Sequence, residues 1–180
     1  MRFFAFILVA LLLAAVPAIA HDWFVEDPPL LGVGVGVAQI FASDQNIFWG
    51  VEYRPAFRCY HLGPWFFFGT GKNKEYYAAV GMLINIELGH NWILTPSFGA
   101  GYYNAANGLS LGFDAEFRSA IELTKRFSND HRLGLRFAHL SNGSLSDYNP
   151  GTETLGLFYS IPLDFLFRRA APVSVADLSH

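Results

Sequence analysis

The chain has 180 residues, of which 52% are hydrophobic, 17% aromatic and only 15% charged, and its formal net charge is −3. This aromatic content excludes a disordered chain, and the acidic balance argues against binding to nucleic acid. A single cysteine, Cys59, excludes an internal disulfide framework and a multi-thiolate zinc site. Because a soluble domain carries roughly 25% charged residues, we expect much of this surface to face something other than water.

The first twenty residues are typical of a secretory signal peptide. Arg2 forms a short positive region, residues 3–16 are apolar, and a small-x-small cleavage pattern ends at Ala20. The alternative is a retained membrane anchor, but the apolar stretch is short for a span. We therefore predict that residues 1–20 are removed and that the exported chain begins at His21.

The rest of the chain alternates between apolar and polar residues, as half-buried strands do. It contains no continuous apolar window of about 18 residues that would form a membrane helix. Scattered glycines and prolines also argue against a bundle of membrane helices. Eight strands separated by turn-forming residues are predicted at 32–42, 48–58, 62–69, 75–88, 92–103, 112–127, 131–141 and 153–167.

The alternation separates an apolar face from a charged face. In the last predicted strand the odd positions from Leu155 to Phe167 are all apolar. Tryptophan, tyrosine and phenylalanine lie near strand ends, as in the aromatic girdles of membrane barrels. The opposite face of the strands carries both signs of charge, at Glu52, Arg54, Arg58, Asp114, Glu116, Arg118, Glu122, Arg126, Arg132 and Arg136.

These patterns predict an all-β fold: an eight-stranded antiparallel up-and-down transmembrane β-barrel over residues 21–167. Its outer face would contact lipid, and its narrow interior would pair arginine with glutamate. A secreted sandwich or a lipocalin-like barrel is the alternative, but it would turn its charges outward to water. Residues 168–180 form a polar C-terminal tail that we expect to be disordered.

One predicted hairpin carries residues with catalytic chemistry. His139 and Ser141 are two apart on one strand, so they share a face at a Cα separation of about 6.6 Å. Glu153 opens the next antiparallel strand and can reach the histidine. A nucleophile, a base and a carboxylate that orients the base are the parts of a serine hydrolase triad. The alternative without catalysis is that Ser141 opens a turn and that His139 lies at the membrane interface.

The parity of the strands places this triad on the outside of the barrel. His139 and Ser141 continue the apolar series that includes Phe137, and Glu153 begins the series that starts at Leu155. Polar groups that face lipid are costly without a purpose. Bacterial barrels place their long loops outside the cell, so the triad would lie at the outer leaflet. A substrate that arrives laterally within that leaflet would be a lipid ester.

Other chemistry finds little support in the sequence. A Gly-x-Ser-x-Gly nucleophile elbow is absent, and Gly32, Gly34 and Gly36 lack the spacing of a dinucleotide motif. The histidines outside the hairpin are isolated or terminal. We therefore expect no metal site and no cofactor.

The hairpin resembles that of the lipid A 3-O-deacylase family (PagL-type acyloxyacyl hydrolases). The resemblance rests on the run Phe-Ala-His-Leu-Ser-Asn-Gly at 137–143 and the run Asn-Pro-Gly-Thr-Glu at 149–153. It implies an eight-stranded barrel in the outer membrane of a Gram-negative cell and, as substrate, the lipid A of lipopolysaccharide in the outer leaflet. The chain departs from the family in its 13 residues after Phe167 and in the loop segment 144–148.

The resemblance also assigns residues to roles. It implies Ser141 as nucleophile, His139 as general base and Glu153 as the partner of the histidine. It places Asn142, Gly143 and Asn149 near the oxyanion hole. Two other functions stay open, a non-enzymatic structural or adhesive barrel and an outer-membrane phospholipase, and so does a homodimer.

Overall fold

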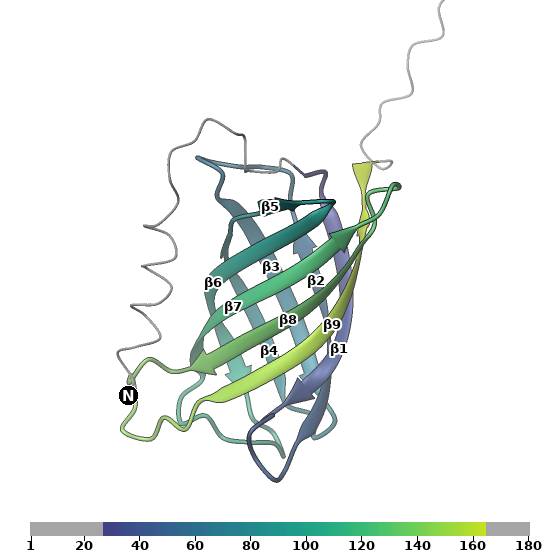
Figure 1. Ribbon diagram of the computed structural model, residues 1–180. Coiled ribbons are helices and arrows are strands. Elements are labelled where there is room, and N and C mark those ends of the chain that lie inside the picture. Colours follow the sequence, from purple (N-terminus) through teal and green to yellow (C-terminus); the bar gives the residue numbers. More distant parts are fainter. Residues whose placement is uncertain (1–26, 165–180) are drawn as a thin grey trace, which may run out of the picture.

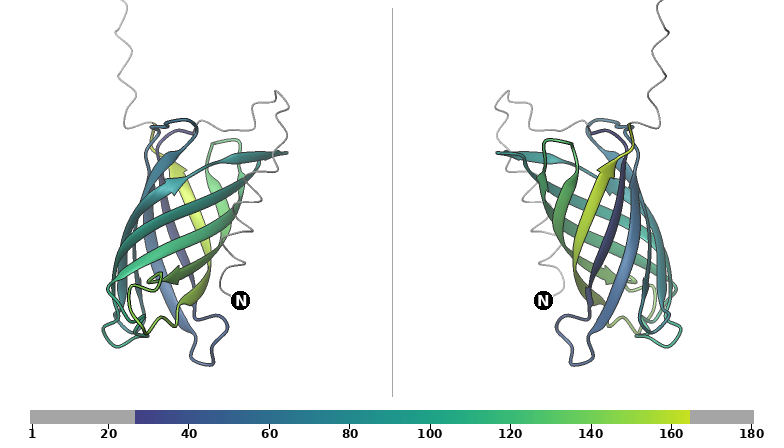
Figure 2. Two further views of the ribbon diagram at one scale, coloured as in Figure 1. Left: turned by 90° about the vertical axis from the view of Figure 1, so that its left-hand side faces the viewer. Right: turned by 90° about the vertical axis from the view of Figure 1, so that its right-hand side faces the viewer.

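A computed structural model describes residues 27–164, and these form a closed antiparallel barrel of nine strand segments (Figures 1 and 2). Within this range no helix is long and apolar enough to cross a membrane. The expected signal peptide, 1–20, and the expected tail, 168–180, lie outside the described residues. The strands are β1 (Leu30–Ala38), β2 (Asn46–Arg54), β3 (Gly63–Gly71), β4 (Tyr76–Leu83), β5 (Ile86–Gly89), β6 (Trp92–Asn104), β7 (Ala115–Arg126), β8 (Arg132–Ser141) and β9 (Thr152–Pro162).

Pairing of the first strand with the last closes the barrel. β1 pairs with β9 over its full length, from Leu30 opposite Pro162 to Ala38 opposite Thr154. On the far side β4 pairs with β6, and β5 pairs with the beginning of β6. β4 and β5 thus share one position in the wall, and the predicted eight-stranded antiparallel barrel is confirmed.

The strand predicted at 75–88 is interrupted between β4 and β5, and a proline explains the break. Pro96 of β6 lies opposite the gap and has no N–H to donate to the ladder. The amide of Ile84 still donates to the carbonyl of Pro96, at 3.1 Å. The side chain of Asn85 turns inward, where it donates to Asp27 and accepts from Thr95.

Several predicted strands were too long at their ends. The strand predicted at 32–42 stops at Ala38, because Gln39 takes a positive φ of 59°. β2 ends before Pro55, which cannot donate to the ladder. Arg58 therefore lies in the connection between β2 and β3 and not on β2, although its side chain remains within 3.8 Å of Asp27. β7 begins at Ala115, so the strand excludes Asp114.

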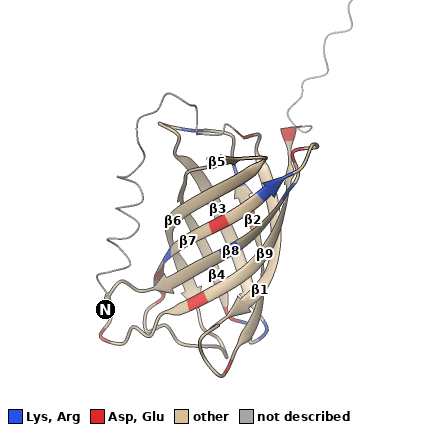
Figure 3. Cartoon of the chain, in the orientation of Figure 1, with Lys and Arg blue, Asp and Glu red and all other residues tan. Residues whose placement is uncertain are grey.

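The two faces of the wall match the predicted alternation. Outward positions such as Trp49, Ile121 and Leu157 are exposed, whereas Glu116 and Glu122 on the inner face are buried. Figure 3 shows how few charged positions the strands carry. Since nothing in the described barrel covers the apolar outer face, that face suits lipid.

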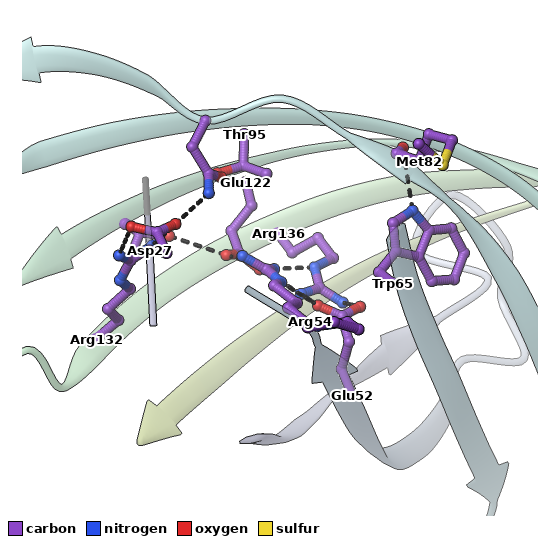
Figure 4. Close-up of polar contacts among 12 residues, drawn as sticks. Asp27, Glu52, Arg54, Trp65, Met82, Thr95, Glu122, Arg132 and Arg136 are labelled. Atoms are coloured by element: carbon purple, nitrogen blue, oxygen red, sulfur yellow. Dashed lines mark hydrogen bonds and ion pairs between the residues drawn. The ribbon is translucent and has the colours of Figure 1, made fainter. Parts of the chain in front are cut away.

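Two groups of ion pairs lie in the interior (Figure 4), beside an apolar cluster that includes Trp65, Tyr77 and Leu140. In the central group, Arg136 contacts Glu52 at 2.7 Å and also binds Glu122. Arg54 joins the same two carboxylates, at 2.7 and 2.9 Å, and Arg118 lies 3.4 Å from Glu52. Opposite charges from β2, β7 and β8 are thereby neutralised where water is excluded.

The second group lies at one end of the barrel. There Asp27 binds Arg132 of β8 and accepts from Asn85. We call this the turn end, because the connections 55–62, 90–91 and 127–131 lie there with both ends of the described chain. The connections 39–45, 72–75, 105–114 and 142–151 lie at the opposite end, which we call the loop end (lower end in Figure 1).

The central ion pairs predict an unequal effect of two arginine substitutions. Arg136→Met should lower the free energy of unfolding by about 3–5 kcal/mol, because two buried carboxylates would each lose a partner. Arg126→Met is the matched control, since Arg126 makes a single, partly exposed pair with Glu87 and such pairs contribute about 0–1 kcal/mol. Urea unfolding in detergent micelles, followed by tryptophan fluorescence, measures both. Equal losses would contradict a central role for Arg136.

Candidate active site

The candidate site lies where β8 and β9 reach the loop end. β8 ends at Ser141 and β9 begins at Thr152, and the ladder places His139 directly opposite Glu153. Both side chains point outward, because the alternating positions Ala138 and Leu140 are buried in the barrel. The structure thus brings together the histidine and the glutamate predicted from the sequence.

The histidine and the glutamate are in direct contact on the outer surface. Nδ1 of His139 lies 3.1 Å from Oε1 of Glu153, and the two side chains are 46% and 31% exposed. A carboxylate beside Nδ1 favours the tautomer with its proton on Nδ1, which leaves Nε2 as the basic nitrogen. The imidazole is therefore oriented to act as a base.

Gly151 lies close to the imidazole of His139. A Cβ atom added to this glycine would lie 3.1 Å from Cε1 of His139 and 3.7 Å from Nε2. Gly151 comes directly before Thr152, the ladder partner of Leu140, so the ring leans toward the loop end, where Ser141 is located. The positive φ of Gly151, 65°, is a conformation that favours glycine.

Ser141 is partly exposed beside this ring. It ends β8 on the same outward face as His139 and pairs with Phe117 of β7. Within residues 27–164 its hydroxyl makes no hydrogen bond, and none joins it to His139. Ser141 and His139 are therefore neighbours on one face, with the serine hydroxyl free to turn.

Asn142 is fully buried, and its side chain fastens two loops. Its amide donates to the carbonyls of Leu111, at 2.9 Å, and Tyr148, at 3.0 Å, and its oxygen accepts from the amide of Ser144, at 3.0 Å. Both N–H groups of the side chain are thus used within the protein. The residue holds loop 142–151 against loop 105–114.

Two other polar groups beside Ser141 keep free donors. The side-chain oxygen of Asn149 accepts from the amide of Asn142 at 3.2 Å, which orients the side chain of Asn149 toward the end of β8. In the described part of the chain, neither the side-chain N–H groups of Asn149 nor the backbone N–H of Gly143 has an acceptor. The geometry thus separates Asn142, whose side chain is fully engaged, from Gly143 and Asn149.

A serine that was not predicted from the sequence lies on the opposite flank of the histidine. Ser119 of β7 lies directly across from His139 and points outward. Its position interrupts the apolar series of β7 between Phe117 and Ile121, and that interruption was a signal that could have found it.

The remaining histidines of the described barrel lie at the turn end. His131 contacts the hydroxyl of Tyr159 at 2.6 Å through Nδ1, and the carbonyl of His90 accepts from Lys125. In residues 27–164 no three or more histidine, cysteine, aspartate or glutamate side chains are grouped to hold a metal ion.

Comparison with known proteins supports the same fold. The crystal structure of the outer membrane enzyme PagL matches with a TM-score of 0.57 at 18% identity, over 74% of this chain and 99% of that one. Neisserial surface protein A (NspA) matches with a TM-score of 0.60 at 9% identity, over 74% and 96% of the two chains. At these identities the likeness shows the fold alone.

Sequence comparison finds one family. The lipid A deacylase PagL of Pseudomonas aeruginosa is 37% identical over 54 residues, which are 30% of this chain and 31% of that relative. The matched stretch therefore spans about a third of the relative's length. The family model described as lipid A 3-O-deacylase (PagL) matches residues 32–162. Because this match runs from within β1 to the end of β9 and includes the whole hairpin, the chain belongs to the lipid A 3-O-deacylase (PagL) family, and family and fold indicate an outer-membrane protein.

Proposed function

We propose that this protein is an outer-membrane serine esterase that removes the 3-O-linked (hydroxy)acyl chain from the lipid A of lipopolysaccharide. The observation that carries the proposal is the outward-facing imidazole of His139, held by Glu153 at 3.1 Å next to Ser141. Membership in the PagL family supplies the substrate class. A substrate that diffuses within the outer leaflet reaches such a site directly, without entering the barrel.

The proposed reaction begins with proton transfer from the serine. Nε2 of His139 takes the proton of the Ser141 hydroxyl as the oxygen attacks the ester carbonyl of the acyl chain. Glu153 accepts a hydrogen bond from Nδ1–H throughout, which holds the ring and stabilises the imidazolium that forms. The tetrahedral intermediate then collapses, and the sugar oxygen leaves with the proton that His139 returns.

A second half-reaction restores the enzyme. The acyl group is now an ester of Ser141, and a water molecule attacks its carbonyl while His139 takes a proton from that water. Collapse releases the fatty acid and returns the proton to Ser141. Water and lipid ester are consumed, and a free fatty acid and a lipid with one new hydroxyl are produced.

The oxyanion is stabilised by donors from the hairpin. The free donors beside Ser141 are the backbone N–H of Gly143 and the side-chain amide of Asn149, and we assign the oxyanion hole to them. Asn142 acts as a positioning residue, because its side chain holds the loop and its backbone N–H orients Asn149. One preorganised donor of this kind contributes about 2.7–4 kcal/mol to stabilisation of the transition state.

Loss of an acyl chain from lipid A is the direct test of the proposed function. Lipid A from a Gram-negative host that expresses the wild type should lose the mass of one 3-O-linked (hydroxy)acyl chain in mass spectrometry. Lipid A from hosts that express Ser141→Ala or His139→Ala should keep that mass, since each substitution removes a reacting group. All three proteins must be shown in the outer membrane at equal levels.

Other outcomes of this experiment separate the alternatives. Unchanged lipid A together with new lysophospholipids would indicate a phospholipase. Unchanged lipids of both kinds would favour a structural or adhesive barrel, and full activity of Ser141→Ala would refute Ser141 as the nucleophile.

Glu153 should matter for rate and not for folding. Glu153→Gln keeps the size of the side chain but removes the charge that stabilises the imidazolium, so we expect kcat to fall by up to roughly 10⁴-fold. Initial rates of fatty acid release in detergent micelles measure this effect, and heat-dependent gel mobility reports the folded barrel. A rate within a factor of two of the wild type would exclude the proposed role of Glu153.

Gly151→Ala should displace the imidazole. The new Cβ would press on Cε1 of His139 at 3.1 Å, so we expect kcat to fall by about tenfold, a loss of about 1.4 kcal/mol. Gly89→Ala is the matched control, because Gly89 also has a positive φ, 87°, but open space around its Cβ direction. Both variants should lose similar stability in urea, whereas only Gly151→Ala should be slow. Equal rates for the two would show that Gly151 does not position the ring.

A further inference from the structure

The outer face of the barrel carries few polar side chains. Along the described strands the outward positions are apolar or tyrosine except for Thr70, Asn104, Ser119, Lys125, His139, Ser141 and Glu153. Thr70 donates to the carbonyl of Glu75, and the side-chain oxygen of Asn104 accepts from the amide of Ala106. Lys125 bonds to a carbonyl at the turn end.

The remaining four residues form one group, which we call the outer polar cluster: Ser119, His139, Ser141 and Glu153. They come from three neighbouring strands, and Ser119, His139 and Glu153 lie in one row across β7, β8 and β9. Nothing in the catalytic proposal uses Ser119. In the described barrel its hydroxyl has no hydrogen-bond partner, and an unpaired polar group that faces lipid is costly unless it has a function.

The position of Ser119 argues against a role as the nucleophile. The imidazole leans toward the loop end, where a Cβ atom added to Gly151 would lie 3.1 Å from its Cε1. Ser119 lies farther into the wall. The free donors that suit an oxyanion hole also lie in the hairpin, beside Ser141. The hydroxyl of Ser119 is therefore available to the substrate and not to the base.

The depth of Ser119 decides which part of the substrate it meets. Ser119 is two ladder positions nearer the centre of the wall than Ser141, because Ser141 pairs with Phe117 and His139 pairs with Ser119. The sugar of a lipid ester lies on the loop side of the reacting carbonyl, and the acyl chain extends toward the membrane centre. A group that contacts Ser119 therefore belongs to the acyl chain.

We propose that Ser119 is a specificity-determining residue that binds a hydroxyl on carbon 3 of the acyl chain. This inference rests on the proposed function. Strand spacing and residue rise place Ser119 and Ser141 about 8 Å apart. Three segments along a bent path fit this separation. The Ser141 oxygen attacks the carbonyl carbon from about 3 Å, and that carbon lies roughly 3–4 Å from a hydroxyl on carbon 3. The hydrogen bond from that hydroxyl to Ser119 adds about 2.8 Å.

The residues around Ser119 are apolar and would contact the rest of the acyl chain. Phe98 lies directly opposite on β6 and stacks with Phe117, with ring centroids 6.1 Å apart. Ile121 follows on β7, and Phe137 pairs with it on β8. A hydroxyl among these side chains has Ser119 as its partner at that depth, whereas an unsubstituted chain leaves Ser119 unpaired.

The test compares two substrates that differ in one hydroxyl. We would measure kcat/KM in detergent micelles for glucosamine 1-phosphate acylated at O3 with either a 3-hydroxytetradecanoyl or a tetradecanoyl chain. The wild type should prefer the hydroxylated ester by roughly two- to tenfold, the worth of one hydrogen bond. Ser119→Ala should abolish that preference and still cleave the unsubstituted ester at the rate of the wild type.

Two further variants control the comparison. Ser119→Thr keeps the hydroxyl and should keep the preference, while Ser128→Ala removes a hydroxyl at the turn end and should change neither rate. Heat-dependent gel mobility must show all variants folded.

The outcomes distinguish this inference from the proposed function. Activity of Ser119→Ala with the preference intact, or with both rates lowered equally, would overturn the role of Ser119 while leaving the esterase in place. A wild type that cleaves neither ester and also leaves lipid A unchanged would refute the proposed esterase, and the role of Ser119 with it.

Discussion

Closure of the barrel by the pairing of β1 with β9 is the constraint on which the rest of the structure depends. Once the wall is closed, each strand residue faces either a narrow interior or the surroundings, with a period of two. Charges inside the wall are costly unless opposite charges compensate them, and Glu52, Glu122 and Arg136 meet this condition at its centre. The outer face is left apolar, so each polar residue on it needs an explanation.

The outer polar cluster is the exception, because it places polar side chains together on an otherwise apolar outer face. A β-ladder suits this purpose, because direct cross-strand pairs hold side chains at a fixed separation without a loop or a cofactor. His139 lies between Glu153 and Ser119 in such a row. The hairpin adds what the ladder lacks, since buried Asn142 secures a loop that presents free N–H donors beside Ser141. Rigid wall and fastened loop together preorganise the proposed site.

Much of this could be predicted from the sequence, because alternation and turn residues are local signals. The eight strand positions, the inward charges and the contact between His139 and Glu153 all followed from parity and from the order of the strands. The predicted strand ends were wrong where the backbone of one residue stops the strand, at the positive φ of Gln39 and at Pro55. The break between β4 and β5 arises from Pro96 on the neighbouring strand, which no pattern within 75–88 reveals.

By itself the sequence determined the strand count, the two faces and the strand that carries each candidate catalytic residue, since those properties depend on residue order and a period of two. Only the tertiary structure decided the exact register of each strand pair and which groups meet across the interior of the barrel. It placed Ser119 opposite His139 across the β7–β8 hairpin. It joined Arg136 to Glu52, which are far apart in the chain, and used the side chain of Asn142 to hold the loops. The reason is physical: the turn of each hairpin fixes its register, and closure of the whole barrel fixes the contacts across the interior and between the loops, so no one segment contains them.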